Sequence, residues 1–170
     1  MDFNFTEEHD SLRDAVRRYI DKSYTFQQRQ AFVKVGGFDR KAYSALAELG
    51  LTGLSISEAY GGMGMGPVES MIVMEELGRG IALEPMSQTL LCSQIFQAFA
   101  SDNFKQAWLP KIASGEALIV FAHQERGARN QWRKCEAKAV KGPAGFALSA
   151  TKNIVSVGDH ADAFLVPAQL

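Results

Sequence analysis

The sequence predicts an α+β protein, in which an all-α helical bundle at the N-terminus is followed by the first strands of an antiparallel β domain. Two observations support this class. Up to about residue 115, apolar residues recur at intervals of three and four, the spacing of one face of a helix. From Ala117 onward they form a short continuous run or alternate with charged residues, which is typical of strands. We therefore expect a helical domain over residues 1–115 and a partial β domain over residues 116–170.

The first helix is expected to begin after Thr6, because a threonine hydroxyl suits the N-cap position. Glu7 and Glu8 then place carboxylates in the first turn, where the helix dipole favours them. The apolar residues that follow at helical spacing predict one buried face: Leu12, Val16, Tyr19 and Ile20.

A second helix is expected from Asp39 to Gly50, since glycine commonly follows the last turn of a helix. Its inward side chains are predicted to be Tyr43, Leu46 and Ala47.

A glycine-rich stretch precedes the third helix. Its glycines stand at positions 61, 62, 64 and 66, and Pro67 suits the first turn of a helix. The spacing is not GxGxxG followed by an acidic residue, and no GK[ST] follows, so neither a dinucleotide nor a phosphate loop is indicated. We interpret it as a tight surface loop before a buried helix. Residues 71–74 are four consecutive apolar residues, so that helix is expected to run through the middle of the bundle.

Two further helices complete the predicted bundle. The fourth is marked by Leu91, Ile95 and Phe99, and the fifth by Phe104, Trp108 and Ile112. Pro110 is expected to bend or end the fifth helix.

Four strands are expected in the second half of the chain. Residues 118–121 form a short apolar run that favours a strand buried on both faces, and residues 134–139 alternate as in a half-exposed strand. The GPAG sequence at 142–145 predicts a turn, and residues 146–157 and 163–166 are predicted to be strands.

Composition excludes several classes of function. The chain has 170 residues, 46% of them apolar, and a formal net charge of −1. Because it lacks a broad basic field, we expect neither nucleic acid nor a membrane surface as a partner. The acidic start and the absence of an apolar run of about 18 residues argue against a signal peptide and a membrane span, so a cytoplasmic location is expected. Cys92 and Cys135 lack metal-site spacing and are expected to be reduced thiols, and no metal site is expected.

Four segments carry a family resemblance in series. They are residues 46–66, which contain LGLTGLSISEAYGGMGMG, then MEELGR at 74–79, WLPKIASGEAL at 108–118 and GDHADAFLVPA at 158–168. In this order and spacing they resemble the N-terminal helical domain and the start of the middle β domain of the acyl-CoA dehydrogenase superfamily. The resemblance covers essentially the whole chain.

The resemblance implies that this chain corresponds to an N-terminal portion of such an enzyme. In the family, the β domain continues and a second helical bundle follows, which carries the catalytic base. We therefore expect the base to lie beyond Leu170, the C-terminal helical domain to be absent, and the chain alone to have no catalytic residue and no activity. The carboxylates of Glu58, Glu75, Glu76 and Glu125 are interpreted as capping or surface-paired groups.

The resemblance also implies a bound FAD. In the strand that contacts the flavin, Phe121 matches an aromatic position, His123 an apolar one, Gln124 the usual threonine and Asn130 the usual serine. We expect His123 to be a satisfied interior or solvent-facing residue rather than an acid or base.

A second family signature corresponds to residues 152–158. There Ile154 replaces the tryptophan that lies against the flavin, and Ser156 keeps a hydroxyl near its N5.

The resulting hypothesis is an FAD-dependent acyl-CoA dehydrogenase that forms α,β-unsaturated acyl-CoA and assembles as a homo- or hetero-oligomer, a dimer or tetramer. A flavin oxidase or monooxygenase on the same fold is one alternative. A non-catalytic subunit of a hetero-oligomeric dehydrogenase is the other, and the residues at positions 124 and 154 favour it. A cationic cluster is either a solvated loop or a docking place for a pyrophosphate or CoA phosphate: Arg126, Arg129, Arg133 and Lys134.

Overall fold

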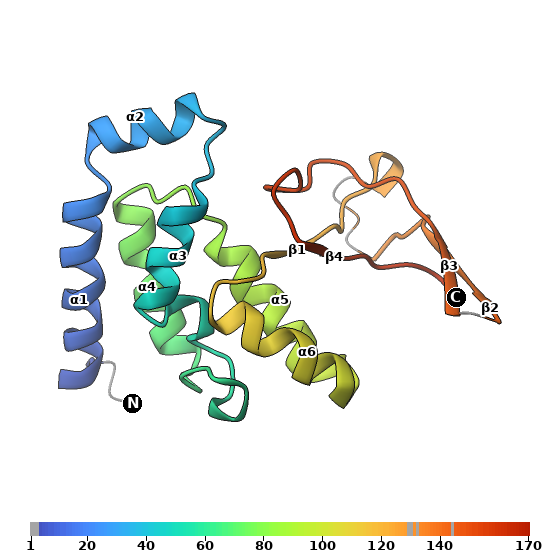
Figure 1. Cartoon of the computed structure of the whole chain (residues 1–170), viewed down its shortest axis with the longest axis horizontal. Coiled ribbons are helices and arrows are strands. Elements are labelled where there is room, and N and C mark those ends of the chain that lie inside the picture. The colour runs from blue at the N-terminus through green and yellow to red at the C-terminus, as the bar shows by residue number, and fades with distance from the viewer. Residues whose placement is uncertain (1–3, 129–130, 132, 144) are drawn as a thin grey trace. The chain divides into compact units, whose positions relative to one another are not determined.

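Figure 1 shows the computed structural model of the chain, which describes residues 4–128, 131, 133–143 and 145–170. The chain divides into two compact units, Met1–Ala117 and Leu118–Leu170. The first unit is helical and the second contains short strands, which confirms the predicted α+β class.

The helices are α1 (Glu7–Ser23), α2 (Phe26–Lys34), α3 (Arg40–Glu48), α4 (Pro67–Arg79), α5 (Met86–Phe99) and α6 (Asp102–Ala113). The strands are β1 (Ile119–Phe121), β2 (Lys138–Gly142), β3 (Gly145–Ser149) and β4 (Ala163–Leu165), and single 3-10 turns lie at Leu51–Gly53, Glu58–Tyr60 and Arg126–Ala128.

The N-terminal ends of α1 and α4 are tied together. Thr6 caps α1 as predicted, and its hydroxyl accepts a hydrogen bond from the His9 N–H at 3.2 Å. The Thr6 N–H donates to His9 Nδ1 at 3.2 Å, which leaves His9 Nε2 to donate to Glu69 Oε1 at 2.9 Å. The other oxygen of Glu69 accepts from the Gly66 N–H at 2.8 Å. One histidine therefore joins the caps of two helices that are far apart in sequence.

The α2 helix was not predicted from the sequence. Thr25 caps it, and the side chain of Gln28 bonds back to the Thr25 N–H at 3.0 Å. No residue of α2 is buried, so its sequence lacks the periodic apolar face by which the other five helices could be recognised. In α6, Pro110 does not end the helix, which continues to Ala113.

The glycine-rich stretch is a tight surface loop before α4, as interpreted from the sequence. Its backbone folds onto residues 53–56, because Met63 donates to the Gly53 carbonyl at 3.0 Å and Gly64 donates to the Ile56 carbonyl at 2.8 Å. A Cβ atom on Gly62 would lie 2.1 Å from the Ile56 oxygen. Only glycine permits this approach of two backbone segments.

At the C-terminal end of α4, close packing and the left-handed conformation fall on two neighbouring residues, although a single glycine often provides both. Gly80 follows the helix with φ of −85°, and a Cβ there would lie 2.0 Å from Ile20 Cγ2 of α1. The left-handed residue is instead Ile81, with φ of 52°. The Ala82 N–H then bonds to the Leu77 carbonyl at 2.9 Å and closes the last turn. Close packing against Ile20 therefore requires glycine at position 80, and the β-branched Ile81 adopts the strained left-handed conformation.

The α4 helix packs against α1 through a buried carboxylate as well as through apolar residues. Glu76 is fully buried, which corrects its interpretation as a surface-paired group. Arg17 of α1 donates to both of its oxygens, at 2.6 and 3.1 Å, and Arg79 donates at 2.7 Å while also pairing with Asp21 at 2.8 Å. The hydrogen bonds from Arg17 hold the pKa of Glu76 below its ordinary value. The four consecutive apolar residues therefore do not make α4 buried on all sides, because Met71 is 52% exposed and the buried position 76 holds a carboxylate.

Replacing Glu76 with glutamine is expected to lower the free energy of unfolding of the helical unit by about 1–2 kcal/mol, since charged hydrogen bonds are lost from partly exposed arginines. Because the hydrogen bonds from Arg17 depress the folded pKa of Glu76, its contribution is fully present above the unfolded pKa of about 4.3 and is lost as the pH falls through the lower folded value. Urea unfolding followed by helical circular dichroism at pH 7 and at successively lower pH below the unfolded pKa measures both effects.

Glu75→Gln is the matched control for this experiment. Its carboxylate lies 3.6 Å from Arg13 and its side chain is 63% exposed. An equal loss of stability in both variants at pH 7 would contradict the role given to Glu76.

The strands of the second unit form two pairs. β1 and β4 pair in parallel, with Phe121 opposite Leu165, which the sequence did not predict. β2 and β3 pair antiparallel on either side of residues 142–145, where the sequence predicted a turn. The strand expected over 146–157 ends at Ser149, and positive φ angles at Ile154 and Val157 are incompatible with extended backbone in its expected second half. The strand expected from residue 134 begins at Lys138.

Among the described residues, no helix combines the length and the hydropathy that crossing a lipid bilayer requires.

Candidate functional site

A buried ion pair organises the second unit. Lys152 Nζ lies 2.6 Å from Glu125 Oε1, and the two side chains are 7% and 4% exposed. Glu125 also accepts hydrogen bonds from the N–H groups of Glu136 and Ala137. Lys152 also donates to the Pro167 carbonyl at 2.9 Å. This pair therefore holds four segments of the chain together, and it explains why β2 starts late: the N–H groups of residues 136 and 137 bond to a carboxylate rather than to a strand.

The charge of Glu125 is strongly favoured in this environment. The hydrogen bond from Lys152 and those from the backbone lower the pKa of Glu125 to about 2. The carboxylate is therefore ionised at any physiological pH. It cannot serve as a general base near neutrality, because its proton affinity is too low.

The two segments that carry the expected cofactor residues lie next to each other. The first leaves β1, where the Ala122 N–H bonds to the Leu165 carbonyl at 2.9 Å, and continues to Glu125. The second follows β3, and there the Asn153 N–H donates to the Gln124 carbonyl at 2.8 Å. With the Lys152–Glu125 pair directly beside this bond, residues 124–125 and 152–153 are joined through both backbone and side chains.

The residues expected on the first segment differ in exposure. Phe121 ends β1 and is half-buried, and its ring stacks on that of His123 with centroids 5.4 Å apart. His123 is also half-buried, so it is neither an interior residue nor a fully solvent-facing one. The side chain of Gln124 is exposed, and its amide offers both donor and acceptor atoms. Asn130 lies outside the described residues.

The second segment presents an apolar side chain and a hydroxyl to solvent. Ile154 is 83% exposed and has φ of 51°, a left-handed conformation that is uncommon for a β-branched residue. Ser156 is also exposed. Backbone strain of this kind is found most often at functional sites, where the surrounding structure maintains it.

The other charged residues singled out in the sequence differ in exposure. Glu125 is buried rather than surface-paired, which corrects its interpretation, while Glu58 and Glu75 are exposed. In the cationic cluster, Lys134 pairs with Glu136 at 3.1 Å and donates to the Gly127 carbonyl at 2.9 Å. Arg126 and Arg133 are exposed, and Arg129 lies outside the described residues.

A hollow of about 520 Å³ lies beside the ion pair. Arg126 and the carboxylates of Glu125 and Glu136 all line it, so its charges offset one another. The hollow is therefore poorly suited to bind a phosphate group. Within the described ranges, no group of three histidine, cysteine or acidic side chains is arranged to hold a metal ion.

Sequence reasoning gave Lys152 no role of its own. A lysine in a sequence carries no sign of burial, and its partner stands 27 positions earlier. The only available signal was that Glu125 and Lys152 each lie within one of the two segments that carry the family signatures.

Comparison with known proteins identifies the class. The family model described as "Acyl-CoA dehydrogenase, N-terminal domain" matches residues 6–116. The chain therefore belongs to the acyl-CoA dehydrogenase superfamily, as its motifs predicted.

Particular relatives agree with this assignment. The chain is 31% identical to (2S)-methylsuccinyl-CoA dehydrogenase of Cereibacter sphaeroides over 79% of its length, and this match covers 25% of that protein. It is 28% identical to the mitochondrial isovaleryl-CoA dehydrogenase of Bos taurus over 96% of its length, covering 39% of that protein. A solved structure, the Tcur3481–Tcur3483 steroid ACAD G363A variant, has a TM-score of 0.87 and 28% identity, with 95% of this chain and 45% of that chain covered. The chain thus spans less than half the length of these relatives.

Replacing Lys152 with methionine is expected to loosen the second unit, because it leaves the buried Glu125 carboxylate without its cation. Hydrogen exchange of the Asn153 N–H, which is bonded to Gln124, should become faster by roughly tenfold. Since the folded pKa of Glu125 is about 2, the protection that depends on this pair should persist down to about pH 4 and be lost as the pH falls towards 2.

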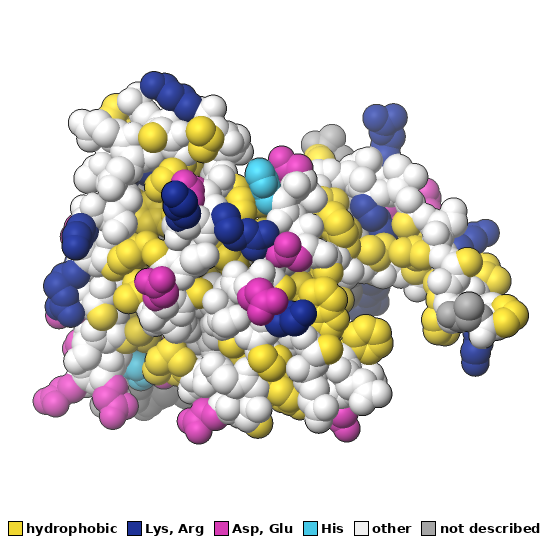
Figure 2. Space-filling view, in the orientation of Figure 1, with side chains coloured by type: hydrophobic (Ala, Val, Ile, Leu, Met, Phe, Trp, Pro, Cys, Tyr) yellow, Lys and Arg dark blue, Asp and Glu magenta, His cyan; other side chains and the backbone are white. Residues whose placement is uncertain are grey.

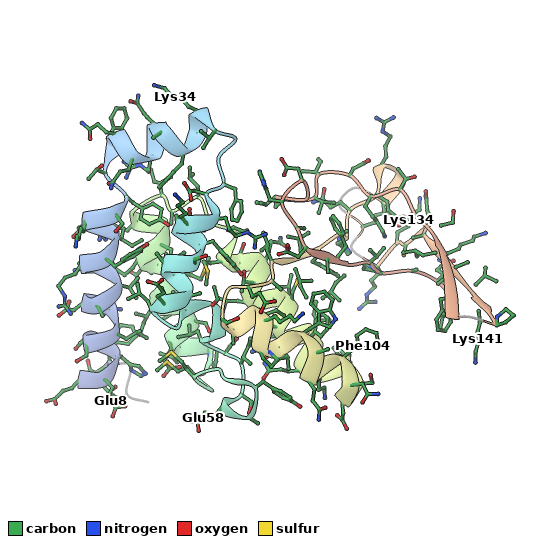
Figure 3. All side chains as sticks on the ribbon, in the orientation of Figure 1. Glu8, Lys34, Glu58, Phe104, Lys134 and Lys141 are labelled. Atoms are coloured by element: carbon green, nitrogen blue, oxygen red, sulfur yellow. The ribbon has the colours of Figure 1, made fainter. Side chains whose placement is uncertain are left out.

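The control is Lys134→Met, which removes an exposed lysine paired with an exposed glutamate in the same unit (Figure 3). Exchange at Asn153 should stay unchanged in this variant. Unchanged exchange in Lys152→Met would show that the ion pair does not hold the two segments together.

Proposed function

We propose that this chain forms the N-terminal part of an FAD-dependent acyl-CoA dehydrogenase that acts in the cytoplasm on an acyl-CoA thioester. The catalytic base belongs to a part of that protein outside these residues. The role of this chain is to shape one side of the flavin pocket and to supply the helical domain. The observation that carries the proposal is the direct joining of the two signature segments by the Asn153–Gln124 and Lys152–Glu125 contacts.

The residues present fit a flavin. Gln124 and Ser156 are exposed donor groups, and Ile154 exposes an apolar side chain on the segment joined to Gln124. A flavin ring needs such a combination, because its carbonyl and ring nitrogen atoms take hydrogen bonds and its faces are apolar. FAD, when bound, supplies the group that accepts a hydride from the acyl chain. We assign contacts with it to Phe121, His123, Gln124, Ile154 and Ser156, together with Asn130 from the sequence pattern.

Gln124 is proposed to tune the cofactor. Its side-chain amide can donate a hydrogen bond to an anionic acceptor, and such a bond is stronger than one to a neutral group. A donor at this position favours the more anionic, reduced form of the ring.

A non-catalytic subunit is the second candidate. Gln124 and Ile154 replace the family's threonine and tryptophan, and loss of an aromatic contact weakens binding by about 1 kcal/mol. A solved relative is named as the pair Tcur3481–Tcur3483. In this reading the chain belongs to a hetero-oligomer and supports an active partner subunit.

The protein that contains this chain together with the remaining domains of the family provides the test. Gln124→Ala should lower the two-electron potential of its bound flavin by roughly 30–65 mV, the equivalent of about 1.5–3 kcal/mol for one charge-assisted hydrogen bond. Titration against a reference dye measures the potential. Gln131→Ala, which truncates a nearby exposed glutamine, is the control and should leave it unchanged. An unchanged potential in Gln124→Ala, with unchanged flavin content, would favour the non-catalytic subunit.

The 170-residue chain alone should show no dehydrogenase turnover, because Glu76 and Glu125 are held ionised by cations and the catalytic base is proposed to lie outside these residues. A dye-reduction assay with added FAD and acyl-CoA thioesters of several chain lengths checks this. Turnover above that of FAD without protein would contradict the placement of the base elsewhere.

A further inference from the structure

A groove that the proposed flavin site does not use lies beside α2. It has a volume of about 380 Å³ and lies between α2 and the segment that follows α4. We call it the α2 groove, and the lining residues that matter here are Phe26, Val33, Ile81 and Leu83, which are apolar, and Arg29 and Lys34, which are cationic. Figure 2 shows hydrophobic and cationic side chains side by side on this end of the helical unit.

The apolar residues of the groove are unusually exposed. Phe26, Val33 and Ile81 are 62%, 63% and 60% exposed, and α2 itself buries no residue. Single exposed apolar side chains are ordinary on a protein surface, but a cluster of them around a hollow marks a place where something binds.

Ile81 lies at the edge of the groove. Its φ of 52° belongs to the end of α4, where the left-handed residue follows Gly80. The side chain of this residue is left largely exposed at the groove, where it adds to the apolar surface of Phe26 and Val33.

The charge of the groove favours an anion. Two of its lining residues, Arg29 and Lys34, are cationic, and none of its described lining residues is acidic. Arg29 is held in place by the carbonyls of Tyr24 and Gly80, the latter at 3.1 Å, and Lys34 stands at the C-terminal end of α2 (Figure 3). Neither Arg29 nor Lys34 has a carboxylate partner among the residues that the structure describes.

We propose that the α2 groove binds the anion of a fatty acid, with its alkyl chain along Phe26, Val33 and Ile81 and its carboxylate beside Lys34. The hollow is concave and of the size that suits a small molecule, whereas a protein partner would cover a larger surface and a membrane would meet protruding residues. The proposal does not depend on the flavin site, which lies in the other unit.

Binding of radiolabelled decanoate, kept below its micelle concentration, is measured by equilibrium dialysis with the 170-residue chain. Val33→Gln should weaken binding by about five- to tenfold, because it removes apolar contact. Lys34→Gln should weaken it by about three- to fivefold, and decan-1-ol should bind less tightly than decanoate.

Two control variants carry the same kinds of substitution at exposed residues outside the α2 groove. Leu91→Gln alters an exposed leucine that lines a different apolar hollow, and Lys41→Gln removes a nearby exposed cation outside the groove. Both should bind decanoate as the unaltered chain does, and circular dichroism confirms that all variants keep their helices.

Three results would overturn the proposal. Decanoate binding that survives Val33→Gln, or is lost in Leu91→Gln, would place the ligand elsewhere. Equal affinity for decan-1-ol would remove the role of the cations. Binding to anionic phospholipid vesicles without binding of monomeric decanoate would identify a membrane-contact surface instead.

Discussion

The buried Glu125–Lys152 pair is the constraint on which the second unit depends. The strands around it are three to five residues long, so ladder hydrogen bonds alone give little rigidity. Removing two charges from water is costly, and it is offset here because the carboxylate accepts two backbone N–H groups and the ammonium donates to the Pro167 carbonyl. The polar groups are satisfied only when all four segments are in place. The pair therefore specifies one arrangement of the loops that carry the proposed flavin contacts.

In the helical unit, polar contacts likewise fix how two elements are placed relative to each other. His9 and Glu69 link the caps of α1 and α4, and Glu76 with its two arginines links the same helices further along. Two polar contacts at separate levels fix the register between these helices more tightly than apolar packing alone, because hydrogen bonds are directional whereas the hydrophobic effect is not. The glycine-rich loop adds a backbone contact in which Gly62 lies against the Ile56 carbonyl.

Two isoleucines with positive φ, Ile81 and Ile154, share an unexpected property. Both are largely exposed, so each combines backbone strain with an apolar side chain in water. Neither state stabilises the chain by itself. Ile154 lies on the segment joined to the proposed flavin strand, and Ile81 lies at the end of α4 and at the edge of the α2 groove.

The sequence by itself determined the fold class, the family, five of the six described helices and the turn around residues 142–145. These features depend on local signals, such as the Thr6 and Asp39 caps, the glycine loop and the apolar periodicity. Residues close together in the sequence encode each of these signals. Tertiary structure alone decided the burial of Glu76 and Glu125, the parallel pairing of β1 with β4 and the joining of Gln124 to Asn153. Each of these depends on partners tens of residues away, and a residue's type does not record which distant group will satisfy it. The α2 helix belongs with them, because it buries no side chain and so leaves no apolar pattern in the sequence.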